Sequence, residues 1–168
     1  MEQARFELLV VPYRKAAYNL ARWLTGNDHD AEDVVQEAFL RAYRFFDRFQ
    51  GGDGRAWLLA IVRNTCYSWM RQNRNLALTE TLDEVEAFGP SPESLLIENL
   101  DRESLRRAIQ ELPVEFREAI ILRELEGLSY KDIAAVTEVP VGTVMSRLAR
   151  ARARLIRALG KRNAGGTS

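Results

Sequence analysis

One acidic, interrupted segment divides this 168-residue chain into two helical halves. From Thr79 to Asp101 there are seven acidic residues and no lysine or arginine, and Gly89-Pro90-Ser91-Pro92 interrupts the segment. On either side, apolar residues recur at the spacing of amphipathic helices, and no strand-like alternation of any length occurs. We therefore predict an all-α fold of two small helical domains joined by a flexible, extended acidic linker.

The predicted domain boundaries follow changes in charge. Residues 1–75 carry a net charge of +2, residues 76–103 carry −7 and residues 104–168 carry +5, so the overall charge of zero conceals three different blocks. We predict a first domain at 1–75, a linker at 76–103, a second domain at 104–162 and a tail at 163–168. This asymmetry favours a polyanionic partner for at least one end of the chain.

The first domain contains three amphipathic segments separated by helix breakers. Their expected spans are about 6–24, 28–46 and 55–72. Pro12 should bend or delay the first helix, because proline lacks an amide donor. Asp28 should cap the second helix.

The second domain contains four expected helices. Their spans are about 104–112, 113–127, 129–136 and 140–159. Pro113 suits a first helical turn, and Ser129 with Asp132 three residues later is an N-cap pattern. Gly127 marks the end of the second of these helices.

The stretch from Tyr130 to Ala149 has the pattern of a helix-turn-helix, in which two helices are joined by a tight turn. On a helical wheel Val144 faces inward, whereas Ser146 and Arg150 point the opposite way. Residues 144–162 hold seven basic side chains and no acid. Arginines on the outer face of such a helix suit a DNA major groove and its phosphates. The alternative is a solvated face, because arginine also favours helices.

Several classes of function have no support in the sequence. We find no phosphate-binding glycine loop, no nucleophile-base arrangement and no metal-ligand cluster, so we expect neither an enzyme nor a cofactor or metal site. Cys66 is the only cysteine, and its place within a helix predicts a small core residue. No apolar run approaches the ~20 residues that cross a bilayer, and we expect a cytoplasmic protein.

Two sets of motifs resemble a known family, the extracytoplasmic-function (ECF) sigma factors of bacterial RNA polymerase. The stretch from Gly127 to Ala134, Gly-Leu-Ser-Tyr-Lys-Asp-Ile-Ala, followed by Pro140-Val141-Gly142-Thr143-Val144, resembles region 4 of the family. The stretch from Asp30 to Phe39 and the stretch from Trp57 to Asn64 resemble region 2. The matches lie in the family's order and cover nearly the whole chain up to about Arg162.

The resemblance implies a role in promoter-specific transcription initiation with core RNA polymerase, promoter DNA and an anti-sigma factor as partners. Region 2 would dock on the clamp helices of the largest polymerase subunit, and region 4 would lie near the flap of the second-largest subunit. The positions implied for polymerase binding are Asp33, Gln36, Glu37, Leu40 and Arg41. The acidic linker would either lie in the basic channel where the transcript exits or serve as a tether.

The resemblance also implies two DNA-reading sites. The positions for the minus-ten element are Phe49, Asp53 and Asn64. The positions for the minus-thirty-five element are Thr143, Met145, Ser146, Arg147, Ala149 and Arg150. Met145 departs from the family, which often has arginine at this position, so we expect an altered base preference there. We expect the aromatic side chain of Trp57 to be part of the core rather than to stack on bases.

Two other classes of function remain open on the sequence. A stand-alone helix-turn-helix regulator would account for the second domain, but not for the region 2 motif or the acidic linker. A protein-interaction module that mimics a sigma factor would have no need of the basic last helix.

Overall fold

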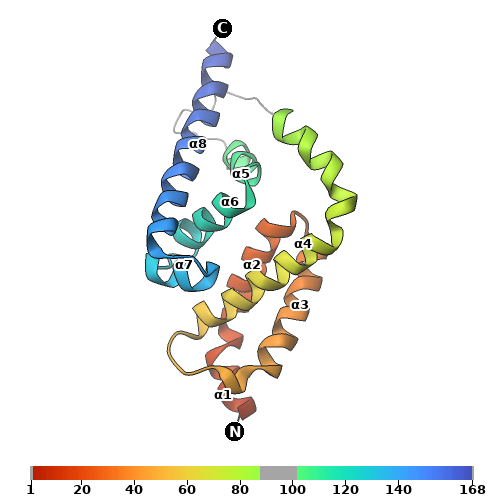
Figure 1. The fold of residues 1–168 in the computed structure, drawn as a ribbon, viewed down its shortest axis with the longest axis vertical. Helices are drawn as coiled ribbons and strands as arrows, with labels where there is room; N and C mark the ends of the chain where they lie inside the picture. The colour runs from red at the N-terminus through yellow and green to blue at the C-terminus, as the bar shows by residue number, and fades with distance from the viewer. Residues whose placement is uncertain (1, 88–101, 168) are drawn as a thin grey trace.

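The structure, a computed structural model, describes residues 2–87 and 102–167 (Figure 1). Within these two ranges every regular element is a helix, which confirms the predicted all-α fold. The N-terminal domain contains α1 to α4 and the C-terminal domain contains α5 to α8. Among the described residues, none of the helices combines the length and the apolar character that a membrane span requires.

The first predicted helix is interrupted at Pro12. The chain forms α1 (Glu2–Leu9), a single 3-10 turn η1 (Val11–Tyr13) and then α2 (Arg14–Thr25). Proline has no amide hydrogen to continue the α-helical ladder, and it lies in the first turn of η1, where that donor is not needed. The predicted bend therefore occurs as a complete break between two helices.

The turn between α2 and α3 (Asp28–Arg44) uses a different cap from the predicted one. Gly26 adopts a φ of 94°, which ends α2, and the Asn27 side chain accepts a hydrogen bond from the Asp30 amide at 2.8 Å. The prediction of Asp28 as the cap was wrong by one residue. Asp28 instead accepts hydrogen bonds from Arg22 Nε at 2.7 Å and from the Tyr18 hydroxyl at 3.0 Å.

Aromatic side chains pack together at the end of the N-terminal domain where α1, η2 and the start of α4 meet. A 3-10 turn, η2 (Phe46–Arg48), follows α3 and places Phe46 against Phe6, with ring centroids 5.4 Å apart. Phe49 stacks on Phe46 at 5.6 Å, and Trp57 contacts both rings. The prediction of a core role for Trp57 is confirmed, since it packs against the buried cluster.

The helix α4 (Gly54–Ala87) is longer than the predicted helix, which ended near Gln72. Residues 76–87, expected to form the start of an extended linker, are helical. The physical reason is their composition, because leucine, alanine and glutamate favour a helix and the first breaker is Gly89. The rest of the predicted linker, up to residue 101, lies outside the described residues.

The C-terminal domain forms the expected helices. They are α5 (Arg102–Gln110), α6 (Val114–Ile120), a π turn η4 (Ile121–Leu125), α7 (Tyr130–Thr137) and α8 (Val141–Thr167). Pro113 occupies the position before α6, and Ser129 caps α7 by accepting a hydrogen bond from the Asp132 amide at 3.0 Å. The predicted tail from residue 163 is helical up to Thr167, because α8 continues through it.

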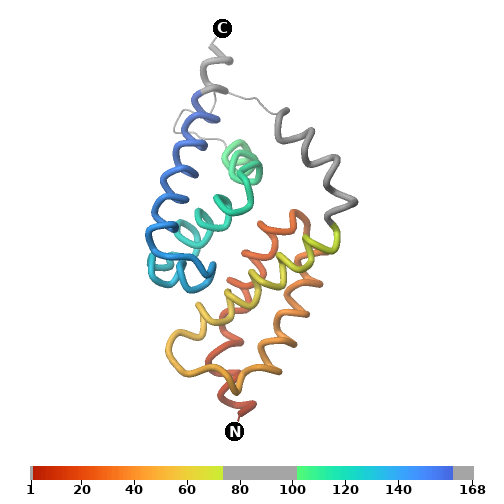
Figure 2. Tube along the Cα trace, in the orientation of Figure 1, coloured from red at the N-terminus to blue at the C-terminus, as the bar shows by residue number. Residues whose placement is uncertain are grey.

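The two domains pack directly on each other. Helix α6 contacts α2, and α7 contacts α4 (Figure 2). One cluster of buried apolar residues continues from the N-terminal domain, including Leu20 and Leu59, into the C-terminal domain, including Ile121 and Leu148. The arrangement is therefore closed, with both domains sharing a core.

The close approach of α4 to the end of α1 predicts that Gly54 tolerates no side chain. A Cβ atom at Gly54 would clash with the carbonyl oxygen of Leu9, which is backbone and has little room to move. We expect Gly54→Ala to lower the free energy of unfolding by about 2–3 kcal/mol, measured by urea denaturation. Gly160→Ala is the matched control, because nothing lies within 4 Å of a Cβ there. Equal stability of both variants would contradict this account of the contact.

Candidate nucleic-acid interface

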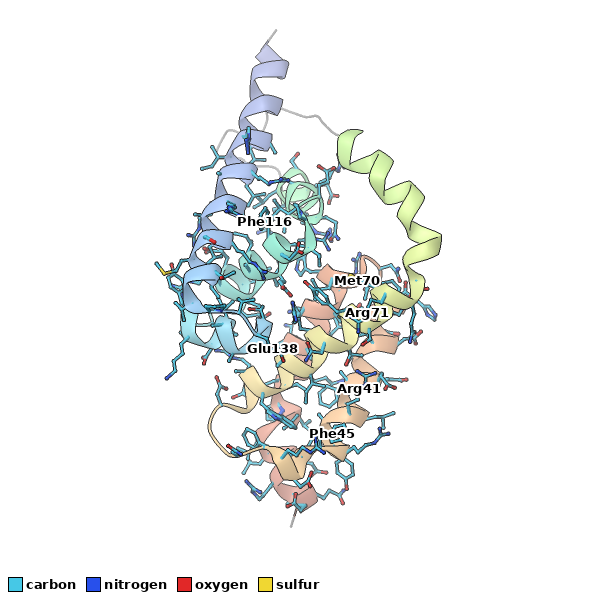
Figure 3. The ribbon with its side chains drawn as sticks, viewed as in Figure 1. Arg41, Phe45, Met70, Arg71, Phe116 and Glu138 are labelled. Carbon is cyan, nitrogen blue, oxygen red and sulfur yellow. The ribbon has the colours of Figure 1, made fainter. Side chains whose placement is uncertain are left out.

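The helices α7 and α8 form a helix-turn-helix around a small buried core. Ile133 and Val136 of α7 pack with Val144 and Leu148 of α8, and all four side chains are buried. The turn between the helices contains Glu138, whose φ of 58° is left-handed and ends α7 (Figure 3). The core predicted from the sequence is therefore present, and it fixes which face of α8 is exposed.

The outward face of α8 agrees with the helical wheel. Ser146, Ala149 and Arg150 are exposed, and Met145 has 52% of its surface accessible. Of the remaining positions implied for the minus-thirty-five element, Thr143 and Arg147 are half-buried, and the Thr143 carbonyl accepts a hydrogen bond from the Ser146 hydroxyl at 3.2 Å. The structure thus brings all six predicted residues together on the first turns of α8.

Two arginines further along α8 make contacts within their own domain. Arg152 forms an ion pair with Glu124 of η4 at 3.1 Å, and the two side chains are 45% and 54% exposed. The Arg154 guanidinium lies 5.3 Å from the ring centroid of Phe116 on α6. These contacts hold α8 against the π turn and α6, while the exposed Arg150 faces outward nearer the start of the helix.

The three residues predicted for the minus-ten element have different surroundings. Phe49 is 8% exposed and stacks within the aromatic cluster, so in this arrangement its ring belongs to the core. Asp53 is exposed and accepts a hydrogen bond from the Arg55 amide at 2.9 Å at the start of α4. Asn64 is exposed on α4.

The residues predicted to bind polymerase share the exposed face of α3. Asp33, Gln36 and Glu37 are exposed, and Leu40 has 61% of its surface accessible. Arg41 is half-buried, pairs with Glu37 at 3.0 Å and reaches the Thr65 hydroxyl of α4 at 3.4 Å (Figure 3). An open hollow of about 350 Å³ lies between α3 and α4 beside this face. The face combines charged groups with one large exposed apolar side chain.

Three potential metal ligands meet at the start of α3, where the sequence predicted no metal site. Ligand atoms of His29, Asp30 and Asp33 lie within 4.8 Å of one another, and His29 and Asp33 are exposed. The Asn27 amide donates a hydrogen bond to the Asp30 carboxylate at 2.6 Å. Carboxylates at a helix start stabilise the positive end of the helix dipole, which accounts for this cluster structurally.

A buried ion pair joins the two domains, and the sequence reasoning missed it. Arg63 of α4 donates from Nε to Glu118 Oε1 at 2.8 Å and from a second nitrogen to Oε2 at 3.2 Å. The Glu118 side chain is fully buried and that of Arg63 is 14% exposed. Burial raises the pKa of the Glu118 carboxyl, and the Arg63 guanidinium opposes this shift. The available signal was that Glu118 directly precedes the apolar run Ala119–Leu122.

Further hydrogen bonds cross the same interface. The Trp23 carbonyl oxygen at the end of α2 accepts from Gln110 at 3.2 Å and from Arg117 at 3.1 Å. Arg55 of α4 donates to the Glu126 carbonyl at 2.9 Å. Each bond pairs a side chain of one domain with a backbone oxygen of the other, so the domains are held in one register.

The fold and the two exposed faces define a class of protein, the DNA-binding factors of transcription initiation. The family model described as Sigma-70 region 2 matches residues 9–76, and the model described as Sigma-70, region 4 matches residues 102–155. These ranges correspond to the two helical domains. The chain belongs to the ECF RNA polymerase sigma factors, because it matches both family models and is 39% identical to members of that family.

Two relatives and one solved structure give the extent of the similarity. The chain is 39% identical over 163 residues to the ECF RNA polymerase sigma-E factor of Escherichia coli strain K12, covering 90% of this chain and 84% of that protein. It is 39% identical to the ECF RNA polymerase sigma factor SigE of Mycolicibacterium smegmatis over 88% of this chain, and spans 58% of that protein's length. The sigma factor RpoE in complex with the anti-sigma factor NepR from Bartonella quintana matches with a TM-score of 0.72 and 33% identity, covering 95% of this chain and 98% of that one.

The burial of Cys66 predicts an inert thiol. Its side chain is fully buried in α4, and burial raises its pKa to about 12. At pH 8 the reactive thiolate is then scarcer than in the unfolded chain by about 10³-fold, because an unperturbed thiol has a pKa near 8.5. We expect a thiol reagent to modify the native protein at least that much more slowly than the guanidinium-unfolded protein. Equal rates would show that Cys66 is accessible.

Proposed function

We propose that this chain binds core RNA polymerase through α3 and positions it at promoters through DNA contacts on α4 and α8. The observation that carries the proposal is that a region 2 domain with an exposed α3 face and a region 4 domain with an exposed helix-turn-helix face occur in succession in one chain. A factor that connects polymerase with two promoter elements needs these surfaces. A stand-alone regulator needs only the second domain.

The α3 face supplies the chemistry of a protein interface. Leu40 is a large apolar side chain exposed among Asp33, Gln36 and Glu37, and an apolar anchor within a polar rim is the usual arrangement of an energetically important contact. Arg41 is held in place by Glu37 and Thr65, so part of the face is ordered before binding. We assign this face to the clamp helices of the largest polymerase subunit.

The minus-ten contact is assigned to α4. Asn64 is exposed on the helix, and its amide carries both a donor and an acceptor, which suits recognition of an unpaired base edge. In the closed arrangement its Oδ1 accepts a hydrogen bond from Arg63 at 3.4 Å. Asp53 shapes the loop by accepting the Arg55 amide, and we give it a positioning role at this site. The buried Phe49 is left out of the contact.

The minus-thirty-five contact is assigned to the first turns of α8. Ser146, Ala149 and Arg150 face outward, and a helix presented in this way by a helix-turn-helix enters the major groove. Arg150 supplies a guanidinium for bases or phosphates. Thr143 and Arg147, which are half-buried, border the same face. The flap of the second-largest polymerase subunit is the partner proposed for the rest of this domain.

An anti-sigma factor is the proposed regulator. The similar RpoE structure from Bartonella quintana is a complex with the anti-sigma factor NepR, and its similarity to this chain covers both domains. A partner that covers the α3 face would compete with polymerase for the same side chains. We therefore propose that this chain is active only when such a partner is released.

Run-off transcription tests the proposed function directly. Purified core polymerase with this protein should initiate at specific new start sites on a pool of promoter fragments. Leu40→Asp should weaken polymerase binding by about tenfold or more, because it places a charge in the apolar contact. Leu8→Asp is the matched control, since Leu8 is 74% exposed on α1 and lies outside the α3 face. Duplex DNA binding without polymerase binding or new start sites would support the stand-alone regulator instead.

Met145 provides a test of the α8 assignment. Methionine cannot make the bidentate contact with guanine that arginine makes, and this contact contributes about 1–3 kcal/mol of base discrimination. Met145→Arg should therefore add a guanine preference at one position of the minus-thirty-five element in a binding-site selection. Ile156→Arg, which adds the same charge at an exposed site further along α8, should leave the selected sequence unchanged. An identical selected sequence for wild type and Met145→Arg would refute the assignment.

A further inference from the structure

The ion pair between Arg63 and Glu118 exists only because the two domains are docked. Arg63 belongs to α4 and Glu118 to α6, and the two hydrogen bonds at 2.8 and 3.2 Å make the contact bidentate. The Arg63 guanidinium also lies 4.0 Å from the ring centroid of Tyr67. Separation of the domains would return both charges to water, so this contact is specific to the closed arrangement.

A buried ion pair favours one geometry while adding little net stability. Removing two charges from water costs several kcal/mol per ion, and their mutual attraction roughly offsets that cost when the geometry is good. The pair therefore selects the docked register of α4 and α6 without making docking irreversible. The hydrogen bonds from Gln110 and Arg117 to the Trp23 carbonyl act in the same way.

The closed arrangement cannot read both promoter elements at once. The two elements are centred about 25 base pairs apart, which is roughly 85 Å of duplex at 3.4 Å per base pair. Helix α7 contacts α4 directly (Figure 2). The two helices proposed to contact DNA, α4 and α8, therefore belong to domains that pack on each other. Simultaneous contact with both elements requires the domains to separate.

Two arginine side chains that contact the C-terminal domain also lie beside the residues proposed for the minus-ten element. Arg63 is adjacent to Asn64 in sequence and is neutralised by Glu118, and Arg55 is two residues after Asp53 and donates to the Glu126 carbonyl. In the closed arrangement these guanidinium groups are directed at the C-terminal domain. Separation would release both of them beside the DNA-contacting surface of α4, where phosphates can take the place of Glu118.

We propose that the Arg63–Glu118 pair is a latch that, together with the shared apolar core, fixes the free chain in a closed arrangement unable to engage a promoter. The inference rests on the proposed function, because the closed arrangement is inhibitory only for a protein that must read two separated elements. Polymerase and DNA then compete with the latch: binding on α3 and α4 draws the domains apart, and Arg63 exchanges a carboxylate for a phosphate.

The test compares the free protein with its Glu118→Gln variant. Donor and acceptor dyes are attached through Leu8→Cys on α1 and Ile156→Cys on α8, both at highly exposed positions, while the buried Cys66 does not react. Glu118→Gln leaves a buried guanidinium without its counterion, so we expect the open population to increase by about tenfold or more, seen as a loss of energy transfer. Glu115→Gln, an exposed glutamate on the same helix, is the matched control and should retain the closed state.

A double variant tests whether opening in Glu118→Gln comes from the unpaired buried charge rather than from damage to the fold. Arg63→Met combined with Glu118→Met removes both charges and fills the space with apolar groups, which is tolerated at buried ion pairs, and should restore energy transfer. If Glu118→Gln fails to fold cooperatively in a thermal melt, Gln110→Ala, which removes one bond to Trp23, should give a smaller shift in the same direction. Unchanged energy transfer in the folded variants would overturn the latch.

Transcription measures whether the closed state is inhibitory. With unlabelled full-length protein and limiting core polymerase, Glu118→Gln should increase the yield of promoter-specific transcripts severalfold over wild type and over Glu115→Gln. Opening without any increase in transcript would overturn the inhibitory role. Failure of wild type to produce specific start sites would refute the proposed function instead, and the energy-transfer measurement would still decide whether the latch exists.

Discussion

A guanidinium and a carboxylate can lie together without water only where two folded surfaces enclose them, and the Arg63–Glu118 pair meets this condition. Its two hydrogen bonds join α4 to α6, and the surrounding hydrogen bonds end on backbone oxygens of Trp23 and Glu126. Because these oxygens are fixed in helix ends and turns, the pair forms in one docking register. The continuous apolar core supplies the attraction, and the ion pair supplies the specificity.

Helix α4 is the element on which both domains depend. One side of it closes the N-terminal core through Leu58 and Val62, another contacts α7, and Asn64 remains at the surface. The same helix therefore carries core packing, interdomain contact and the proposed DNA contact. A substitution in α4 will often affect more than one of these properties, which is why Glu118, on the other side of the interface, is the better position for altering docking alone.

The helices could be predicted from the sequence because their signals are local. The break at Pro12, the cap at Ser129 and the outward face at Ser146 and Arg150 each follow from residues within one or two turns. The cap at Asn27 was missed because neighbouring Asn and Asp residues are about equally good caps. The burial of Phe49 and the partner of Glu118 depend on contacts between segments distant in sequence, so no local pattern determines them. The aromatic cluster shows this most clearly, since Phe6, Phe46 and Trp57 come from three separate elements.

The π turn η4 sets the rotation of Glu118 on α6 relative to the DNA-contacting face proposed for α8. It lies between α6, which carries Glu118, and the helix-turn-helix, and it is wound with wider turns than the α-helix that precedes it. Loss of one residue between Glu118 and η4, where the winding is still α-helical, would rotate Glu118 by about 100° relative to α7 and α8. Glu118 would then face away from Arg63, although every side chain on the outer face of α8 would be unchanged. Insertions and deletions between Glu118 and this turn therefore offer a route by which interdomain docking can diverge while DNA recognition is inherited intact.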